Sequence, residues 1–185
     1  WIAAEYAGRE GGRLLDVGTG SGAIAVALAR LLVASTVDAA DISPQALDFA
    51  AANAAANGVT LRLVRADATA PYGTFAAALP RDRYDTIVSN PPYIPRSEYA
   101  LMRDNVRLYE PAEALFVEDA DPLLFYREIG RKAARLLVPG GRLFFEIHED
   151  FAEGVCRLLA EGGFVDVECR HDMNGRPRMV QCVKR

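Results

Sequence analysis

Three glycines follow a short apolar run in the segment Leu14-Leu15-Asp16-Val17-Gly18-Thr19-Gly20-Ser21-Gly22. The apolar run predicts a strand over 14–17, and the Ala- and Leu-rich residues 23–33 predict a helix, with Ser21 near its start as a cap. Glycines at such a junction let the backbone turn sharply and let a ligand approach the main chain closely. The helix would offer that ligand free N–H groups and the positive end of its dipole.

The rest of the chain alternates between strand and helix patterns. We expect further strands over 36–40, 61–64, 84–89, 142–147, 165–169 and 179–183, and further helices over 44–56, 121–137 and 151–161. This alternation predicts an α/β fold with a sheet of about seven strands, mostly parallel, and helices on both faces. The last two strands, joined through Asn174-Gly175, would form a hairpin that supplies one late antiparallel strand.

The composition narrows the class of protein. The 185 residues fit one domain, which we place at 1–185, and the 51% hydrophobic residues indicate a globular protein. The net charge is 21 − 25 = −4, which argues against a protein that coats nucleic acid. No apolar run is long enough to span a membrane. The three cysteines suit mostly buried thiols in a reducing compartment, so we expect a cytoplasmic protein. The first residue is Trp1 rather than Met, so we expect a piece of a longer chain.

A second carboxylate stands at the end of the next predicted strand. Asp41 follows the strand over 36–40, at about the spacing at which dinucleotide-binding folds place a carboxylate that holds a ribose. With the glycine loop, it suits either a nicotinamide cofactor or S-adenosylmethionine. Asp16 favours the second, because it could face a cation and S-adenosylmethionine carries a sulfonium and an ammonium group. Gly22 also comes one position too early for the dinucleotide pattern G-x-G-x-x-G.

The motif Asn90-Pro91-Pro92-Tyr93 directly follows the predicted strand over 84–89, in the crevice where open α/β sheets bind ligands. The Asn90 side-chain oxygen and the Pro91 carbonyl can accept hydrogen bonds from an amide or amino nitrogen, whose lone pair is otherwise held in resonance. The two prolines fix the direction of the backbone, and Tyr93 offers a flat face to the substrate. The motif predicts methylation of a planar nitrogen by positioning and electrostatics.

The glycine segment resembles the first motif of the class I methyltransferases, D-x-G-x-G-x-G. The resemblance implies a Rossmann-like fold, S-adenosylmethionine as the methyl donor and S-adenosylhomocysteine as the product. It also implies that Asp41 holds both ribose hydroxyls and that Asp67 contacts the adenine edge. The residues expected to hold the cofactor are Asp16, Gly18, Thr19, Gly20, Gly22, Asp41, Ile42, Asp67, Ala68 and Asn90.

Further segments resemble the protein-glutamine N5-methyltransferases that modify peptide-chain release factors. These segments are 106–115 with Glu110-Pro111, Gly140-Gly141, Glu146-Ile147, and the late stretch from Asp172 through Gly175-Arg176-Pro177-Arg178. The resemblance implies that Asn90, Pro91, Pro92 and Tyr93 hold the glutamine of a Gly-Gly-Gln tripeptide in a release factor. Members of that family also carry an N-terminal helical domain, which we do not find in 1–185, and usually a glycine where this chain has His148.

The sequence leaves two other functions open. Asn-Pro-Pro-Tyr also occurs in adenine and guanine methyltransferases, so an enzyme that acts on RNA or DNA is the main alternative. A catalytically silent binding module is the third hypothesis, and both intact motifs argue against it. We expect a monomer that binds neither nucleic acid nor a metal ion, and we expect His148 and His171 to be structural or exposed. Glu110 and Glu146 suit either the site or an ion pair, and a solvated basic face is expected for Arg170, Arg176, Arg178 and Arg185.

Overall fold

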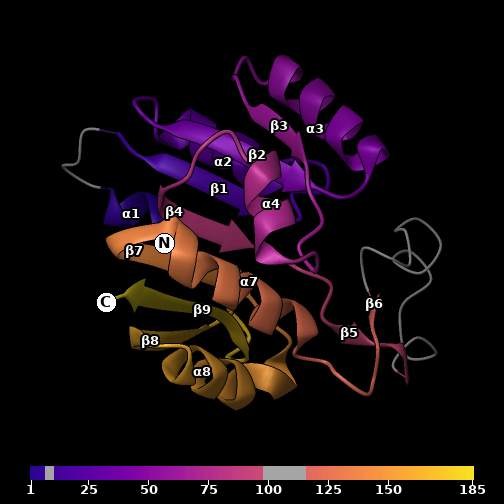
Figure 1. The fold of residues 1–185 in the computed structure, drawn as a ribbon, viewed down its shortest axis with the longest axis vertical. Coiled ribbons are helices and arrows are strands. Elements are labelled where there is room, and N and C mark those ends of the chain that lie inside the picture. The colour runs from indigo at the N-terminus through magenta and orange to yellow at the C-terminus, as the bar shows by residue number, and fades with distance from the viewer. Residues whose placement is uncertain (7–10, 98–115) are drawn as a thin grey trace.

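A seven-stranded sheet forms the centre of the part of the chain that the computed structural model describes, which is residues 1–6, 11–97 and 116–185. The strand order is β3-β2-β1-β4-β7-β9-β8 (Figure 1). β9 runs antiparallel to both of its neighbours, and the pairs from β3 to β7 are parallel. The predicted sheet with one late antiparallel strand is therefore confirmed. The strands are β1 (Arg13–Val17), β2 (Thr36–Asp41), β3 (Arg62–Arg65), β4 (Tyr84–Ser89), β7 (Leu137–Glu146), β8 (Phe164–His171) and β9 (Pro177–Lys184).

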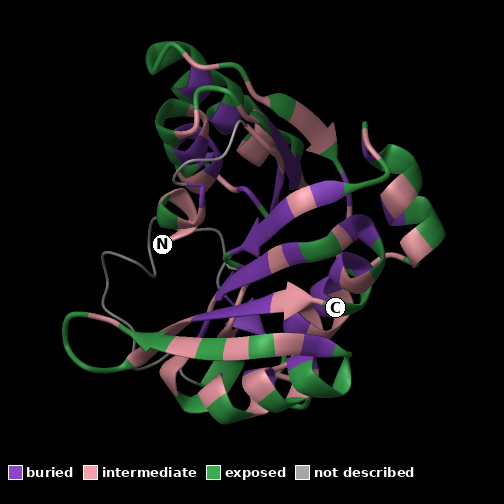
Figure 2. Ribbon diagram, turned by 90° about the vertical axis from the view of Figure 1, so that its left-hand side faces the viewer, coloured by how far each residue is buried: buried purple, intermediate pink, exposed green. Residues whose placement is uncertain are grey.

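Helices cover both faces of the sheet, because successive residues of a strand point to opposite sides. Leu15 and Phe145 enter the core under α4, α7 and α8, whereas their chain neighbours Leu14 and Phe144 enter the core that α1 and α2 cover. Figure 2 shows buried residues concentrated in the middle strands and exposed residues along the edge strand β8. The helices are α1 (Ile2–Glu5), α2 (Ala23–Leu31), α3 (Pro44–Ala56), α4 (Tyr72–Ala78), α7 (Leu124–Leu136) and α8 (Ala152–Glu161), with a 3₁₀ helix η2 (Glu149–Phe151).

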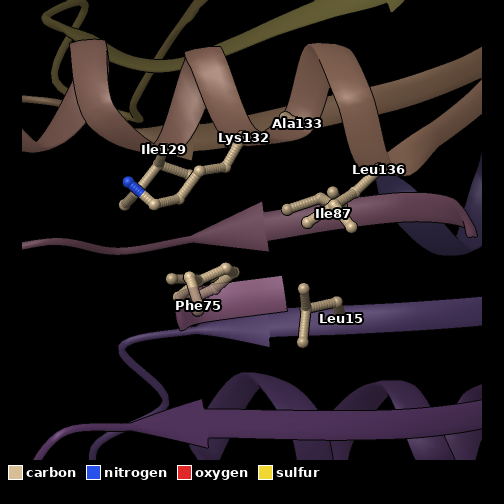
Figure 3. Close-up of a pocket in the computed structure, with 8 residues that line it drawn as sticks. Leu15, Phe75, Ile87, Ile129, Lys132, Ala133 and Leu136 are labelled. Carbon is tan, nitrogen blue, oxygen red and sulfur yellow. The ribbon is translucent and has the colours of Figure 1, made fainter. Parts of the chain in front are cut away.

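A buried lysine lies in the core between α7 and the sheet. Lys132 extends beside Ile129 above β4 (Figure 3), and its Nζ lies 3.2 Å from Glu128 Oε2 and 5.8 Å from the centroid of the Phe75 ring. The described side chains around it, from β1, β4, α4 and α7, leave no room for a water molecule. This space is packed core, so a ligand site has to be sought at the edge of the sheet.

The start of α3 agrees with its prediction, and the start of α2 does not. The Ser43 side chain accepts a hydrogen bond from the Ala46 N–H at 3.3 Å, with Pro44 in the first helical position. The prediction that Ser21 caps α2 is wrong, because Gly22 occupies the N-cap with φ of 80°. This left-handed conformation brings Gly22 against α3, where an added Cβ would lie 3.0 Å from the Ala50 Cβ.

The boundary between α7 and β7 also differs from its prediction. The helix begins at Leu124 instead of 121 or 122, because Asp121 forms a turn in which its carbonyl accepts the Leu124 N–H. β7 begins at Leu137, directly after α7, and includes the segment 139–141 that we expected to precede the strand. Two residues of β4 accommodate this segment in a bulge, since Tyr84 pairs with Leu137 and Thr86 with Arg142.

Four short helices and strands were not predicted, and the first of them is α1, a single turn before β1. α4 follows Pro71 in a stretch that we expected to be irregular. The strands β5 (Ile94–Pro95) and β6 (Phe116–Val117) form a small parallel pair outside the main sheet (Figure 1), although we expected Asn90-Pro91-Pro92-Tyr93 to end all regular structure there. The predicted segment 106–115, including Glu110, lies outside the described residues.

Candidate active site

The glycine loop leaves the carboxyl end of β1 and turns back over β2. The N–H groups of Gly18 and Thr19 donate to the Ala40 carbonyl at 2.8 and 3.0 Å. Gly18 and Gly20 have φ of 71° and 55°, in the left-handed region that favours glycine. A Cβ added to either residue would meet no described atom within 4 Å. The loop therefore presents an open stretch of main chain, as a ligand-binding loop requires.

Asp41 holds the glycine loop and the start of α3 together. Its Oδ2 accepts the Gly20 N–H and its Oδ1 accepts the Ser43 N–H, each at 2.9 Å. Each carboxylate oxygen has a second lone pair, so the group can still accept hydrogen bonds from a ligand. Ile42 is 56% exposed beside it and offers an apolar surface. The predicted ribose-binding carboxylate thus lies directly against the glycine loop.

Asp16 is a buried carboxylate beneath the same loop. Its side chain is 1% exposed, and its Oδ2 accepts the Thr19 hydroxyl at 2.7 Å. Its Oδ1 is buried and has no hydrogen-bond partner within residues 1–6, 11–97 and 116–185. Burial raises the pKa of Asp16 to about 6, against the lowering effects of the Thr19 hydroxyl and the Ala25 N–H. The structure therefore keeps an electron-rich and incompletely satisfied group next to the open loop.

The Asn-Pro-Pro-Tyr motif begins beside the glycine loop. Val17 and Ser89 are register partners in the parallel pair of β1 and β4, so Gly18 and Asn90 leave the sheet side by side. The Ser89 hydroxyl, which the sequence analysis did not single out, fastens these strand ends by donating to the Val17 carbonyl at 2.6 Å. Asn90 is exposed, whereas Pro91 is buried. The motif thus projects a polar side chain from a backbone that packing holds in place.

Tyr93 is anchored at both its hydroxyl and its ring. The hydroxyl donates to Glu146 Oε1 at 3.0 Å, and the ring meets the His148 ring edge-on at a centroid distance of 6.1 Å. Burial, together with the nearby Glu146 carboxylate, raises the pKa of Tyr93 to about 12. Tyr93 is therefore a neutral donor near pH 7 with a fixed ring orientation. Glu146, for which we left two roles open, lines the site through Tyr93.

The third acidic position forms a turn after β3. Asp67 Oδ1 accepts both the N–H and the hydroxyl of Thr69 at 2.7 Å. The Ala66 N–H donates to the Asp41 carbonyl at 2.9 Å, which brings this turn next to the ribose-binding candidate. Ala68 is half-buried and packs against the main core. The contact of Asp67 with an adenine edge remains a prediction.

The histidines and cysteines occupy structural or surface positions. His148 accepts the Asp150 N–H at the start of η2, and His171 is exposed. Cys182 is buried, and Cys156 and Cys169 are partly buried against the core, in line with the expectation of mostly buried thiols. In the described part of the chain, no group of His, Cys, Asp and Glu side chains could hold a metal ion. Among the same residues, no helix is long and apolar enough to cross a membrane.

Comparisons with known proteins agree on the kind of domain. A sequence model described as "Methyltransferase small domain" matches residues 3–108. A protein of Chlorobaculum tepidum named "Release factor glutamine methyltransferase" is 44% identical over 170 residues, which are 92% of this chain and 56% of that protein. A protein of Bacteroides thetaiotaomicron with the same name is 40% identical over 168 residues, 91% of this chain and 59% of that protein. The chain thus spans less than two thirds of the length of these relatives.

Solved structures share the fold. A methyltransferase from Pyrococcus furiosus aligns with a TM-score of 0.70 at 18% identity, over 99% of this chain and 80% of that one. The 16S rRNA N2 G1207 methyltransferase of Thermus thermophilus, solved with AdoMet and guanosine, aligns with a TM-score of 0.62 at 21% identity, over 94% of this chain and 38% of that one. The predicted Rossmann-like class I methyltransferase fold is therefore confirmed.

Proposed function

We propose that this chain, which belongs to the methyltransferase small domain family, transfers a methyl group from S-adenosylmethionine to the side-chain amide of a glutamine. The glutamine would be that of a Gly-Gly-Gln tripeptide in a peptide-chain release factor, and S-adenosylhomocysteine would be the product. The relatives at 40–44% identity support this substrate through their name. Release factors act on ribosomes, so we place the reaction in the cytoplasm and expect a monomeric enzyme.

The residues around the glycine loop fit the cofactor. The open main chain at Gly18 and Gly20 admits a ligand without collision with a side chain. Asp41 has lone pairs left for hydroxyl groups, and the unpartnered Oδ1 of Asp16 suits a ligand that carries positive charge. When bound, S-adenosylmethionine supplies a methyl group activated by its positively charged sulfur. These features favour it over a nicotinamide dinucleotide.

The chain's own contribution to the reaction would be to hold and polarise the amide. The Asn90 side-chain oxygen and the Pro91 carbonyl would accept the two N–H groups of the primary amide. These hydrogen bonds would increase the electron density on the nitrogen and fix its direction of attack. The Tyr93 ring would hold the amide plane by stacking. This arrangement needs no strong general base.

The observation that carries the proposal is the shared origin of the two motifs. Because Val17 pairs with Ser89, the glycine loop and Asn90 start from neighbouring positions of one sheet edge. A cofactor held by the first motif and an amide held by the second would therefore meet. Neither motif alone would bring a donor and an acceptor of a methyl group together.

The alternative is a methyltransferase that acts on guanine or adenine in nucleic acid. The likeness to the rRNA methyltransferase favours it, but at 21% identity that likeness concerns the fold. The net charge of −4 opposes it, because binding to nucleic acid relies on cations that neutralise phosphates. The names of the relatives with higher identity also favour the glutamine substrate.

Incubation with methyl-labelled S-adenosylmethionine tests the proposal. The protein is offered, in separate reactions, a release factor, tRNA, rRNA, DNA, and a release factor whose Gly-Gly-Gln glutamine is replaced by glutamate. We expect label in the intact release factor alone, because a carboxylate has no N–H to donate to the two acceptors. Labelling of a nucleic acid, or of the glutamate variant as well as the intact factor, would contradict the proposal.

A further inference from the structure

We infer that Glu146 is a positioning residue, which sets the orientation of Tyr93 through its hydroxyl and thereby the plane in which the substrate amide is held. The inference rests on the proposed function for its catalytic consequence. Its structural basis is a set of contacts between β7, the Asn-Pro-Pro-Tyr segment and the late hairpin of β8 and β9. The Tyr93 side chain contacts Glu146, the last residue of β7, and His148 two positions further along the chain.

The position of Glu146 is fixed from two sides. It is the last residue of β7, which lies between β4 and β9, and it pairs with Met179 of β9. Its backbone carbonyl accepts the hydroxyl of the buried Tyr126 on α7 at 3.4 Å. The Glu146 side chain therefore starts from a backbone with little freedom to move. Its Oε1, 3.0 Å from the Tyr93 oxygen, then gives the phenol a defined partner.

Arg178 of β9 lies beside the Tyr93 hydroxyl and forms an ion pair with Asp172. Its guanidinium lies near the Tyr93 hydroxyl and acts on the pKa of Tyr93 in the direction opposite to Glu146. Its Nη1 donates to the Ile147 carbonyl at 3.3 Å, and its own carbonyl accepts the Ile147 N–H at 2.9 Å. Arg178 is thus bound to the residue next to Glu146. Arg178 therefore links the Tyr93 hydroxyl to the strand end that carries Glu146.

The Tyr93 ring would turn more freely without Glu146. The contact with His148 is edge-on and restrains one edge of the ring, whereas the hydrogen bond restrains its far end. Without Glu146, Arg178 would be the remaining polar neighbour of the hydroxyl, and a ring with two χ angles could tilt toward it. A tilt would misalign an amide stacked on it, and an error of about 1 Å in position can lower a rate by about 10²-fold. Glu146 would therefore affect turnover more than the binding of the cofactor.

A double-mutant cycle tests whether Glu146 acts through Tyr93. Glu146→Ala and Tyr93→Phe should each lower kcat for the release factor by between about 10-fold and about 100-fold. The double variant should be no more than about 3-fold worse than either single one, because both remove the same hydrogen bond. Glu146→Gln keeps an acceptor oxygen and should stay within about 5-fold of the parent. Glu153→Ala, an exposed ion-pair partner on α8, is the matched control.

Two results of the cycle would overturn the inference. The first is that the losses of the two single variants multiply in the double variant, since Glu146 would then act independently of Tyr93. The second is that Glu146→Gln is as impaired as Glu146→Ala, since the charge and not the hydrogen bond would then matter. Affinity for S-adenosylhomocysteine, measured for every variant, should change less than about 3-fold.

A readout without catalysis separates this inference from the proposed function. The protein is labelled with fluorotyrosine, and the ¹⁹F signal of Tyr93 is assigned by its loss in Tyr93→Phe. Glu146→Ala should shift or broaden this signal, whereas Glu153→Ala should not. If the parent fails to methylate a release factor, the proposed function is wrong, and the ¹⁹F comparison still decides the positioning. An unchanged Tyr93 signal in Glu146→Ala would overturn the inference whatever the substrate is.

Discussion

The buried carboxylate of Asp16 lowers the stability of the folded protein when it is ionised. Its pKa of about 6 lies above the ordinary value of 3.8, so the folded protein binds a proton more readily than the unfolded chain does. The stabilising contribution of protonated Asp16 is complete below about pH 4 and is lost as the pH rises through about 6. At pH 7 the ionised carboxylate reduces the free energy of unfolding of the unliganded protein. A bound cationic ligand would offset this loss.

We therefore expect Asp16→Asn to stabilise the unliganded protein at pH 7. The increase in the free energy of unfolding should be about 1–3 kcal/mol, the scale of the shift in pKa. The difference between the two proteins should shrink as the pH falls from 7 to 4, since wild-type Asp16 then becomes neutral as well. Urea denaturation at several pH values measures it. A difference that does not change with pH would show that the buried charge is not its cause.

Asp41→Ala should weaken the binding of S-adenosylmethionine by about 1.5–3 kcal/mol, the scale of charge-assisted hydrogen bonds. Titration calorimetry with S-adenosylhomocysteine measures this loss. Because Asp41 also holds the Gly20 and Ser43 N–H groups, Asp41→Asn serves as the control that keeps an acceptor. Unchanged affinity in Asp41→Ala, or tighter binding of a nicotinamide cofactor by the parent, would refute the assignment.

Asn90→Ala should separate binding of the cofactor from catalysis. The exposed Asn90 side chain is assigned to the substrate nitrogen, so affinity for S-adenosylhomocysteine should stay within a few-fold of the parent value. The single-turnover rate of methyl transfer should fall by at least about 10²-fold, as expected for one positioned polar group. Single-turnover rates close to the parent value would rule out the amide-holding role.

For single residues, the sequence predicted where the site residues lie better than it predicted which hydrogen bonds they form. The site residues from Asp16 to Asp41 and from Asn90 to Tyr93 gather at one sheet edge, because strand ends in a parallel sheet share that edge. The Tyr93–Glu146 hydrogen bond joins residues 53 apart in the chain. No local sequence pattern shows that the Tyr93 hydroxyl would donate to a residue so far along the chain. The hydrogen bond from the Ser89 hydroxyl to the Val17 carbonyl could not be predicted for the same reason.

At the scale of elements, the glycine loop combines two different demands on glycine. Gly18 needs its positive φ alone, since no described atom lies near a Cβ added there. Gly22 needs both its positive φ and the missing side chain, because an added Cβ would lie 3.1 Å from the Ala50 Cα. The loop thus shapes the ligand site at one end and packs α2 against α3 at the other.

Gly22→Ala should therefore destabilise the protein more than Gly18→Ala. A left-handed alanine costs about 1–2 kcal/mol in either place, and the collision with α3 adds about 1–3 kcal/mol at Gly22. The midpoints and slopes of chemical denaturation measure both variants against the parent. Equal losses in the two variants would contradict the close approach of α2 and α3.

The elements that sequence reasoning missed have physical reasons in common. α4 spans seven residues and follows Pro71, so it is too short to show a helical period. β7 accommodates a Pro-Gly-Gly segment that normally ends regular structure, because a bulge opposite β4 absorbs the extra residues. Both elements depend on packing against the sheet, which local propensity does not contain.

At the scale of the whole molecule, the fold follows from the order of its strands. Parallel pairs from β3 to β7 require helical crossovers on both faces, and the late hairpin inserts β9 between β7 and β8. The alternation of strand and helix patterns predicted a mostly parallel sheet with one late antiparallel strand, but it did not predict the strand order or the place of β9 between β7 and β8. The proposed substrate rests on the chemistry of Asn90 and its neighbours and on the names of the relatives.

The central claim is that the methyl group ends on the amide nitrogen of a glutamine, and mass spectrometry of the methylated substrate tests it most directly. A release factor is incubated with the protein and S-adenosylmethionine, digested, and fragmented peptide by peptide. We predict one added methyl group, located on the glutamine side chain of the Gly-Gly-Gln tripeptide and missing when Asn90→Ala replaces the parent protein. A methyl group on another residue of the factor, or on a nucleic acid base with the factor left unmodified, would contradict the account.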